Sequence, residues 1–334
     1  MPARATSPAQ LRTISLKDIQ RPVADELKHF QRYFRDAMRT SVPLLDHVAR
    51  YLLRQKGKRI RPLLVLLTAK LCGGITEATY RAAALVELLH SATLVHDDVV
   101  DGAEQRRGMF SINAIWKNKV AVLFGDFLLS RGLLLALEYR DYNVLHALSD
   151  AVRRMSEGEL LQIEKSRHLD IDEATYFRII SDKTASLIAA CTKCGALSAT
   201  DDPQIIEEMY QMGEKLGLAF QIRDDLFDYG EEAGKPIGID LKEKKLTLPL
   251  IYALQMAPGT ERRRVLRIVR KKKKSRKDIQ AVADFAEAYG GMAYARERME
   301  ALAGEARAIL ERYPPGDARD ALIDLVDYTV KRTR

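Results

Sequence analysis

Apolar side chains recur along most of the chain at the three- to four-residue spacing of helices that bury one face or are buried throughout. Residues 77–101 are rich in Ala and Leu, contain neither Pro nor Gly, and form a segment far too long for a strand. This pattern predicts one long buried helix. The preceding apolar run begins near Pro62, which suits a first helical turn, and stops at Gly73 and Gly74, which suit a C-terminal cap.

The same spacing continues beyond residue 101. It predicts further helices within residues 119–139, 143–167, 172–199 and 203–229, and shorter amphipathic helices after residue 259. Alternating strand patterns and Asn-Gly hairpin signals are nearly absent, and no repeat with a period of about 20 to 50 residues is evident. Because no Gly/Ser-rich linker divides the chain, we expect one all-α domain over residues 1–334, with residues 1–15 flexible.

The composition is typical of a globular protein, since 47% of the 334 residues are hydrophobic and 30% are charged. The N-terminus lacks the apolar core of a signal peptide. Asp126 and Arg131 interrupt the longest apolar stretches, so no membrane span is expected. Three cysteines, an odd and small number, suggest free thiols in a reducing compartment. We therefore expect a cytoplasmic protein.

Positive charge is concentrated in one segment. Residues 262–277 carry 11 basic and no acidic side chains, and without them the formal net charge of +8 becomes −3. A solvated helix and its loop would explain such a segment. The alternative is peripheral contact with an anionic membrane, which would place the protein at the inner face of that membrane. No motif supports nucleic-acid binding.

Two acidic clusters follow apolar helices with identical D-D-x-x-D spacing. The first contains Asp97, Asp98 and Asp101, and the second contains Asp224, Asp225 and Asp228. Residues four apart share one helix face, so their carboxylates repel each other unless a cation lies between them. Mg²⁺ suits these ligands because it binds carboxylate oxygens and completes its shell with water and phosphate oxygens. One cluster alone can be a solvated helix face, whereas two copies on two apolar helices favour a shared metal site.

Basic residues accompany both acidic clusters. Lys58, Arg59 and Arg61 lie at a helix entry, Arg106 and Arg107 follow the first cluster, Lys183 precedes Thr184 within a long helix, and Lys235 and Lys245 follow the second cluster. Arginine offers phosphate oxygens a fork of donors, and lysine offers a point charge. Metal-binding carboxylates surrounded by such cations predict a ligand rich in anionic oxygens, of which a diphosphate is the natural candidate.

Several segments in this order carry a family resemblance: GKRIRP, LLHSATLVHDDVVD with a following RRG, LFGDFLLS, KTASL, GLAFQIRDDLFDY and GKPIGIDLKEKKLTLPLI. With them the chain resembles the all-trans isoprenyl diphosphate synthases, or polyprenyl synthetases, over roughly residues 20 to 330. The resemblance implies an antiparallel helical bundle around a deep central apolar cavity, usually a homodimer. It also implies Mg²⁺-dependent condensation of isopentenyl diphosphate with an allylic diphosphate.

The resemblance also implies roles for individual residues. Asp97, Asp101 and Asp224 would bind Mg²⁺, and Asp98, Asp225 and Asp228 would support the metal site or reach it through water. The allylic diphosphate would be held by Arg106, Lys183 and Lys235, and isopentenyl diphosphate by Lys58, Arg61, His90 and Arg107. Lys245 would be a further substrate-binding cation. Thr184 and Gln221 would direct oxygen dipoles at the allylic cation.

Product length is predicted from the helix before the first acidic cluster. Ala92 and Thr93, one turn before Asp97, are small, whereas short-chain members of the resembling family have a bulky residue there. A helix over residues 77–101 offers roughly 35 Å of wall, enough for about six to eight isoprene units. We therefore expect a hexa- to octaprenyl product of quinone side-chain type and expect Ala92→Phe to shorten it. A floor near Leu187, Ile188 and Cys191, and a farnesyl or geranylgeranyl product, are the alternatives.

Three further interpretations stay open at this stage. His90 and the His96-Asp97 dipeptide could belong to a helical metal phosphohydrolase, although that leaves the second acidic cluster unexplained. A non-catalytic partner subunit would be expected to lack one or both clusters, and both are present. Cys191 and Cys194 form C-x-x-C without a second ligand pair, so buried thiols are favoured over zinc.

Overall fold

The computed structural model describes residues 14–55, 57–169, 171–230, 238–243 and 245–332. The predicted flexible N-terminal segment lies almost entirely outside the described residues, and so does Lys235. The helices are α1 (Leu16–Gln20), a 3₁₀ turn (Arg21–Val23), α2 (Ala24–Ala37), α3 (Pro43–Arg54), α4 (Ile60–Cys72), α5 (Glu77–Val100), α6 (Ile112–Glu138), α7 (Tyr142–His168), α8 (Glu173–Ile180), a π-helical turn (Ser181–Ala185), α9 (Ser186–Leu197), α10 (Pro203–Phe227), α11 (Ile239–Lys242), α12 (Leu248–Met256), α13 (Gly259–Arg270), α14 (Arg276–Ala288), α15 (Gly291–Glu311) and α16 (Asp317–Lys331). The strands are β1 (Gln105–Arg106) and β2 (Met109–Phe110).

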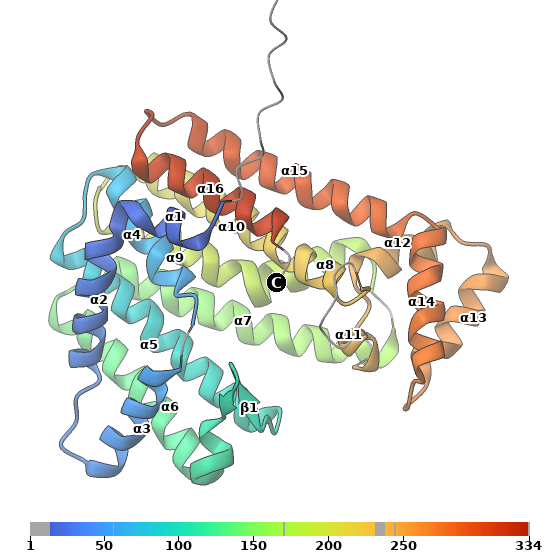
Figure 1. Cartoon of the computed structure of the whole chain (residues 1–334), viewed down its shortest axis with the longest axis horizontal. Coiled ribbons are helices and arrows are strands. Elements are labelled where there is room, and N and C mark those ends of the chain that lie inside the picture. The colour runs from blue at the N-terminus through green and yellow to red at the C-terminus, as the bar shows by residue number, and fades with distance from the viewer. Residues whose placement is uncertain (1–13, 56, 170, 231–237, 244, 333–334) are drawn as a thin grey trace, which may run out of the picture.

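The long helices form a bundle in which α4, α5, α9, α10 and α16 surround the interior. α5 packs along α6, and α10 packs between α9 and α15 (Figure 1). α13 and α14 lie at the opposite end of the molecule from α2 and α3 (Figure 1). The interior side chains are mainly Leu, Val, Ile and Ala, and they form one continuous core cluster. The expected all-α class is therefore confirmed.

Close helix contacts depend on glycine at a few positions. A Cβ on Gly132 of α6 would lie 2.9 Å from Leu85 of α5, and one on Gly125 would lie 2.2 Å from the His96 ring. A side chain at either position would force Leu85 or the His96 ring to move, so glycine allows α6 to approach α5 this closely. This approach fixes the face of α5 that points away from α6 and toward the interior of the bundle.

α6 is also the described helix whose length and apolar composition would allow it to cross a membrane. Asp126 and Arg131 lie within this helix, and the expectation that it does not span a membrane stays a prediction. Only 33% of its most apolar window is buried, because one side packs on α5 and the other is exposed.

Several element boundaries differ from the sequence predictions. The long helix over residues 77–101 is confirmed as α5, whereas the helix expected to begin near Pro62 begins at Ile60. Residues 172–199 were predicted as one helix, but a π-helical turn separates α8 from α9. A tight hairpin, β1–β2, follows the first acidic cluster without the usual Asn-Gly signal. Its turn residues Arg107 and Gly108 have φ of 53° and 75°, as a type I′ turn requires.

Candidate active site

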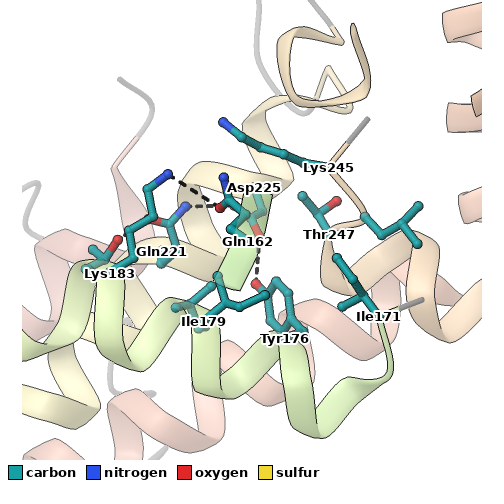
Figure 2. A pocket seen from close by; sticks show the side chains of 12 residues that line it. Gln162, Ile171, Tyr176, Ile179, Lys183, Gln221, Asp225, Lys245 and Thr247 are labelled. Atoms are coloured by element: carbon teal, nitrogen blue, oxygen red, sulfur yellow. Dashed lines mark hydrogen bonds between the residues drawn. The ribbon is translucent and has the colours of Figure 1, made fainter. Parts of the chain in front are cut away.

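A cavity of about 240 Å³ lies between α4, α5, α9, α10 and α16. Its polar lining comprises Lys58, Arg61, His90, Thr93, Asp97, Lys183, Thr184, Tyr328, Thr329 and Arg332. Its apolar lining comprises Ile60, Leu64, Leu94, Met155, Leu187, Ile188, Leu216, Phe220 and Leu325. A smaller pocket of about 70 Å³ shares Lys183 and Thr184 with it (Figure 2). The cavity thus combines charged groups with an apolar interior that can exclude water.

α5 supplies one complete face of this cavity. His90, Thr93, Leu94 and Asp97 all line it, and their spacing of three and four residues places them on one side of the helix. Ala92 is 3% exposed and does not line the cavity. It lies on the side of α5 that meets α6, since Leu85, Leu88 and His96 also lie there. The structure therefore places Thr93, and not Ala92, in the lining of this cavity, while the path of a growing tail stays a prediction.

The first acidic cluster is divided between two environments. Asp97 faces the cavity, and burial followed by repulsion from Asp101 raises the pKa of its carboxyl group. Asp98 is 3% exposed and accepts a hydrogen bond from Arg106 Nε at 2.6 Å. Asp101 is exposed and ends the helix as its C-cap. Asp97 and Asp101 therefore retain an unfavourable interaction that a cation would relieve, while Asp98 is neutralised by the protein.

The β1–β2 hairpin positions the two arginines that follow this cluster. Ser111 Oγ donates to the Ala103 carbonyl at 2.5 Å, and the Tyr51 hydroxyl of α3 donates to the Phe110 carbonyl at 2.7 Å. Arg106 is thereby held against Asp98. Arg107, in the turn, reaches a neighbouring pocket of about 220 Å³ that is also lined by Lys58, Arg59, Arg61 and Glu87.

Arg61, which lines both this pocket and the central cavity, and His90 of the central cavity each carry a buried polar atom without a hydrogen-bond partner among the described residues. Within the described part of the chain, neither Arg61 Nε nor His90 Nδ1 has a hydrogen-bond partner, and both atoms are buried. Burial, then the charges of Arg61 and Arg107, hold the pKa of His90 well below its usual range, so the ring is neutral at pH 7. Since a buried guanidinium is costly without an anionic partner, this arrangement favours an anionic ligand beside Arg61.

The second acidic cluster, at the end of α10, is held by hydrogen bonds. Asp225 accepts the Tyr176 hydroxyl at 2.6 Å and Gln221 Nε2 at 2.8 Å, as Figure 2 shows. Asp224 binds Arg332 Nη2 at 2.8 Å. Asp228 is the C-cap of α10.

Arg332 was not predicted from the sequence. Its side chain is 9% exposed and lines the cavity, and its Cζ lies 4.0 Å from the Phe220 ring centroid. No local signal marks it, because its partner Asp224 is 108 residues away.

Lys183 and Thr184 lie where the two cavities meet. Lys183 pairs with Glu159 and lies 3.4 Å from Gln162 Oε1. Thr184 Oγ1 donates to Gln221 Oε1 at 2.8 Å. Hydrogen bonds therefore run from Thr184 through Gln221 to Asp225. The predicted role of Thr184 and Gln221 toward an allylic cation stays a prediction.

Lys245 lines the smaller pocket (Figure 2). It pairs with Glu243 at 2.5 Å. The structure thus brings together Lys58, Arg61, His90, Asp97, Lys183 and Thr184 in one cavity, with Gln221, Asp225 and Lys245 in the adjoining pocket. Their individual roles toward substrate stay predictions.

The donor set fits Mg²⁺ better than a metal that needs a complete protein cage. Among the described residues, no three His, Cys, Asp or Glu side chains converge to form such a cage. The acidic clusters instead offer a few carboxylates near basic side chains, which suits an ion that keeps waters and binds substrate phosphates. Asp97, Asp101 and Asp224 are the carboxylates expected to hold it, and because they do not form a three-ligand group in this structure, that assignment stays a prediction.

Two alternative sites lose support from the geometry. His96 faces α6, where it contacts the Val122 carbonyl and Asp126, so it does not share the cavity with His90 as a phosphohydrolase centre would require. Cys191 and Cys194 are fully buried, and burial raises the pKa of the Cys191 thiol to about 12. They are core thiols, as the sequence predicted.

Comparison with known proteins agrees with this geometry. Residues 42–286 match the family described as polyprenyl synthetase. The chain is 36% identical over 325 residues to an octaprenyl diphosphate synthase of Escherichia coli, covering 96% of this chain and all of that protein. It is 35% identical to a geranyl-diphosphate-specific all-trans-nonaprenyl-diphosphate synthase of Rhodobacter capsulatus, over 95% and 98% of the two chains.

Solved structures give the same result. A decaprenyl diphosphate synthase from Rhodobacter capsulatus superposes with a TM-score of 0.90 at 34% identity, covering 96% of this chain and all of the other. A polyprenyl synthase from Caulobacter crescentus, in complex with calcium and isoprenyl diphosphate, superposes with a TM-score of 0.87 at 35% identity, covering 97% and 100%.

Proposed function

The chain belongs to the polyprenyl synthetase family, and from this premise we propose that it condenses isopentenyl diphosphate repeatedly with an allylic diphosphate to give a long all-trans polyprenyl diphosphate. The chain is a prenyltransferase. The observation that carries the proposed reaction is that one cavity is lined by Asp97 and Lys183, by Arg61 and His90, and by a large set of apolar side chains.

The reaction requires separate places for two diphosphates. Lys183 lies beside Asp97, so this side suits the allylic diphosphate, whose C–O bond must break. The buried Arg61, with Lys58 and Arg107, suits the diphosphate of isopentenyl diphosphate. His90 is neutral and can therefore donate a hydrogen bond without adding charge.

Bond breaking and bond making can then be assigned to this geometry. As the allylic C–O bond breaks, its electron pair leaves with diphosphate, and Lys183 and Arg106 stabilise that charge. Mg²⁺, when bound at Asp97, Asp101 and Asp224, would add further neutralisation of the leaving group. The isopentenyl double bond attacks the allylic carbon, and the released diphosphate accepts the proton that is then lost. Leu94, Leu187 and Ile188 exclude water, which would otherwise quench the cation.

Incubation of purified protein with Mg²⁺, labelled isopentenyl diphosphate and geranyl, farnesyl or geranylgeranyl diphosphate tests this proposal. We expect labelled products of about six to eight isoprene units, of the type used in quinone side chains. Products no longer than geranylgeranyl diphosphate would support the short-chain alternative. Absence of condensation with every primer would reject the proposed reaction, and phosphate release from nucleotides would support a phosphohydrolase instead.

We propose further that the protein is a homodimer formed through α6. The exposed side of this helix carries a nearly continuous row of large apolar side chains: Ile115, Val122, Leu123, Leu129, Leu133, Leu134 and Leu137, with exposed fractions between 36% and 58%. Exposed apolar patches of this extent mark interaction surfaces. A second copy of the chain is the favoured occupant, because a C2 interface pairs one such helix with itself.

Leu134→Asp is expected to convert the dimer to a monomer in sedimentation velocity, because it places a charge within the proposed interface. Met256→Asp is the matched control, since Met256 is 60% exposed on α12, away from this row, and should leave the dimer intact. A monomeric wild-type protein would contradict the proposal. Partition of the wild type into the membrane fraction after alkaline washing would show instead that α6 inserts into a bilayer.

We also propose that residues 262–277 bind the inner face of an anionic membrane, where a long prenyl product must be delivered. Arg262, Arg263, Arg267 and Arg270 of α13 are exposed, as are Lys271, Lys272 and Lys273 after it. The apolar side of α13, with Val265 and Val269, is buried against the protein. Each basic residue near an anionic surface contributes about 1 kcal/mol, so several together suffice for reversible binding.

Cosedimentation with vesicles of phosphatidylcholine, with and without phosphatidylglycerol, tests this membrane contact. We expect binding only to the anionic vesicles, weakened by salt and lost when Arg267, Arg270, Lys272 and Lys273 are all replaced by serine. Replacing Arg32, Arg35, Arg50 and Arg54 on α2 and α3 removes the same charge elsewhere and should leave binding intact. Equal loss with both fourfold variants, or binding that is insensitive to salt, would reject the assignment.

A further inference from the structure

The turn that carries Lys183 and Thr184 is a π-helix, formed by Ser181–Ala185. The Ser186 backbone N–H donates to the Ser181 carbonyl five residues back, so the Asp182 carbonyl loses its usual helical partner. The Ser186 hydroxyl instead donates a hydrogen bond of 2.6 Å to the Asp182 carbonyl. π-helical turns are rare and occur mostly at functional sites. Here the turn places Lys183 and Thr184 in the lining of both cavities.

Two glycines allow neighbouring helices to press directly on this turn. A Cβ on Gly158 of α7 would lie 2.8 Å from the Lys183 backbone nitrogen. A Cβ on Gly217 of α10 would lie 2.6 Å from the Ala185 Cα. Both contacts involve the turn's own backbone, which cannot move aside as a flexible side chain can. The turn is therefore clamped between α7 and α10.

Arg154 of α7 fixes the turn's side chains as well. Its Nε donates to Asp182 at 2.8 Å, its Nη2 to Ser181 Oγ at 2.9 Å, and its Nη1 to the Tyr210 hydroxyl at 2.5 Å. Ser181 Oγ in turn donates to Glu214 of α10 at 3.0 Å. Arg154 and Asp182 are each only 18% exposed. One guanidinium thus joins α7, the turn and α10.

Arg154 itself does not line either cavity. Its contacts are with the two turn residues that immediately precede Lys183 and with residues of α10. Any influence on the reaction must therefore pass through the turn. We propose that Arg154 is a positioning residue, which acts through Asp182 and Ser181 to hold Lys183 and Thr184 at the junction of the two cavities.

The chain contains a second ion pair, Arg81–Asp141, that serves as a purely structural comparison for Arg154–Asp182. Arg81 donates to Asp141 at 2.6 and 3.2 Å, and the two side chains are 16% and 18% exposed, much like Arg154 and Asp182. This pair joins the N-terminal part of α5 to the start of α7 and touches neither cavity. Arg81→Met should therefore lower stability by an amount similar to Arg154→Met without changing turnover.

The decisive experiment is a double-mutant cycle on condensation activity, and it rests on the proposed prenyltransferase reaction. Arg154→Met is expected to lower kcat/KM for the allylic diphosphate on the order of 100-fold, because misplacement of a catalytic group by about 1 Å has effects of this size. In the Lys183→Met/Thr184→Val background, the same substitution is expected to lower the residual activity less than about threefold, since the positioned groups are already absent.

Arg81→Met is the control and should leave kcat/KM within about twofold of wild type at a matched loss of Tm. An equal effect of Arg154→Met in both backgrounds, or an effect no larger than that of Arg81→Met, would overturn the positioning role. If Arg154→Met does not fold by circular dichroism, Asp182→Asn takes its place in the cycle with the same expected outcomes. An inactive wild-type protein would refute the proposed reaction itself, so the two failures are distinguishable.

Discussion

Asp97→Ala is expected to lower kcat/KM for the allylic diphosphate by about three orders of magnitude, and Asp224→Ala by a similar factor. Loss of a metal ligand removes several kcal/mol of charge stabilisation from the breaking C–O bond, and each 1.4 kcal/mol is about tenfold in rate. The loss of kcat/KM is measured from the rate at which labelled isopentenyl diphosphate is incorporated into product. Asp126→Ala is the matched control, because Asp126 is 59% exposed on α6 and, within the described part of the chain, pairs with His96 alone. It should retain near-wild-type activity.

The same variants separate catalytic from structural roles through their effects on stability. Asp97 is exposed to solvent and its carboxylate is repelled by that of Asp101, so Asp97→Ala should leave Tm unchanged or raise it slightly. Asp224→Ala should lower Tm, because it removes the carboxylate bound by the nearly buried guanidinium of Arg332. Turnover near that of wild type in both variants would show that the acidic clusters do not hold a catalytic metal.

Local sequence patterns predicted those parts of the fold that depend on neighbours along the chain. The helix Glu77–Val100 follows from an uninterrupted run of good helix formers, and the D-D-x-x-D spacing places Asp97 and Asp101 on one side of it. The free, buried state of Cys191 and Cys194 follows from their small number and apolar surroundings. In each case the physical cause lies within a few residues of the feature.

The missed features depend on contacts between distant segments. Arg332 owes its position to Asp224, 108 residues earlier, and Arg154 owes its position to Ser181 and Tyr210, which are 27 and 56 residues away. The π-helical turn lies directly against α7 at Gly158, and no pattern within the turn's own sequence predicts that contact. Sequence reasoning therefore found the charged groups of the site but not the groups that hold them in place.

The face of α5 that lines the cavity was the most consequential of these differences. A small residue before Asp97 can be recognised in the sequence, but its direction depends on which side α6 covers. Because α6 packs against the side with Leu85 and His96, Ala92 is enclosed there and Thr93 points into the cavity. Leu187 and Ile188 line the cavity as expected for a floor, whereas Cys191, one turn further, does not reach it.

Thr93→Phe is therefore expected to change the product from a long chain to a short one. Thr93 lies about one helical turn, roughly 6 Å, from Asp97, and an extended isoprene unit spans about 4–5 Å. A phenyl group there leaves room for about one or two units beyond the unit that carries the diphosphate, so elongation should stop at geranyl or farnesyl diphosphate. The first condensation should survive, because Asp97, Lys183 and Arg61 are untouched.

Chromatographic sizing of labelled products measures this change. Thr93→Val is the matched control, since it removes the hydroxyl that donates to the His90 carbonyl at 2.9 Å but adds no bulk, and it should retain the wild-type product. Ala92→Phe instead forces its ring against α6 and is expected to lower Tm more than Thr93→Phe, because overpacking a closed contact costs about 1–3 kcal/mol. A long-chain product from Thr93→Phe would show that the growing tail does not pass along this face of α5.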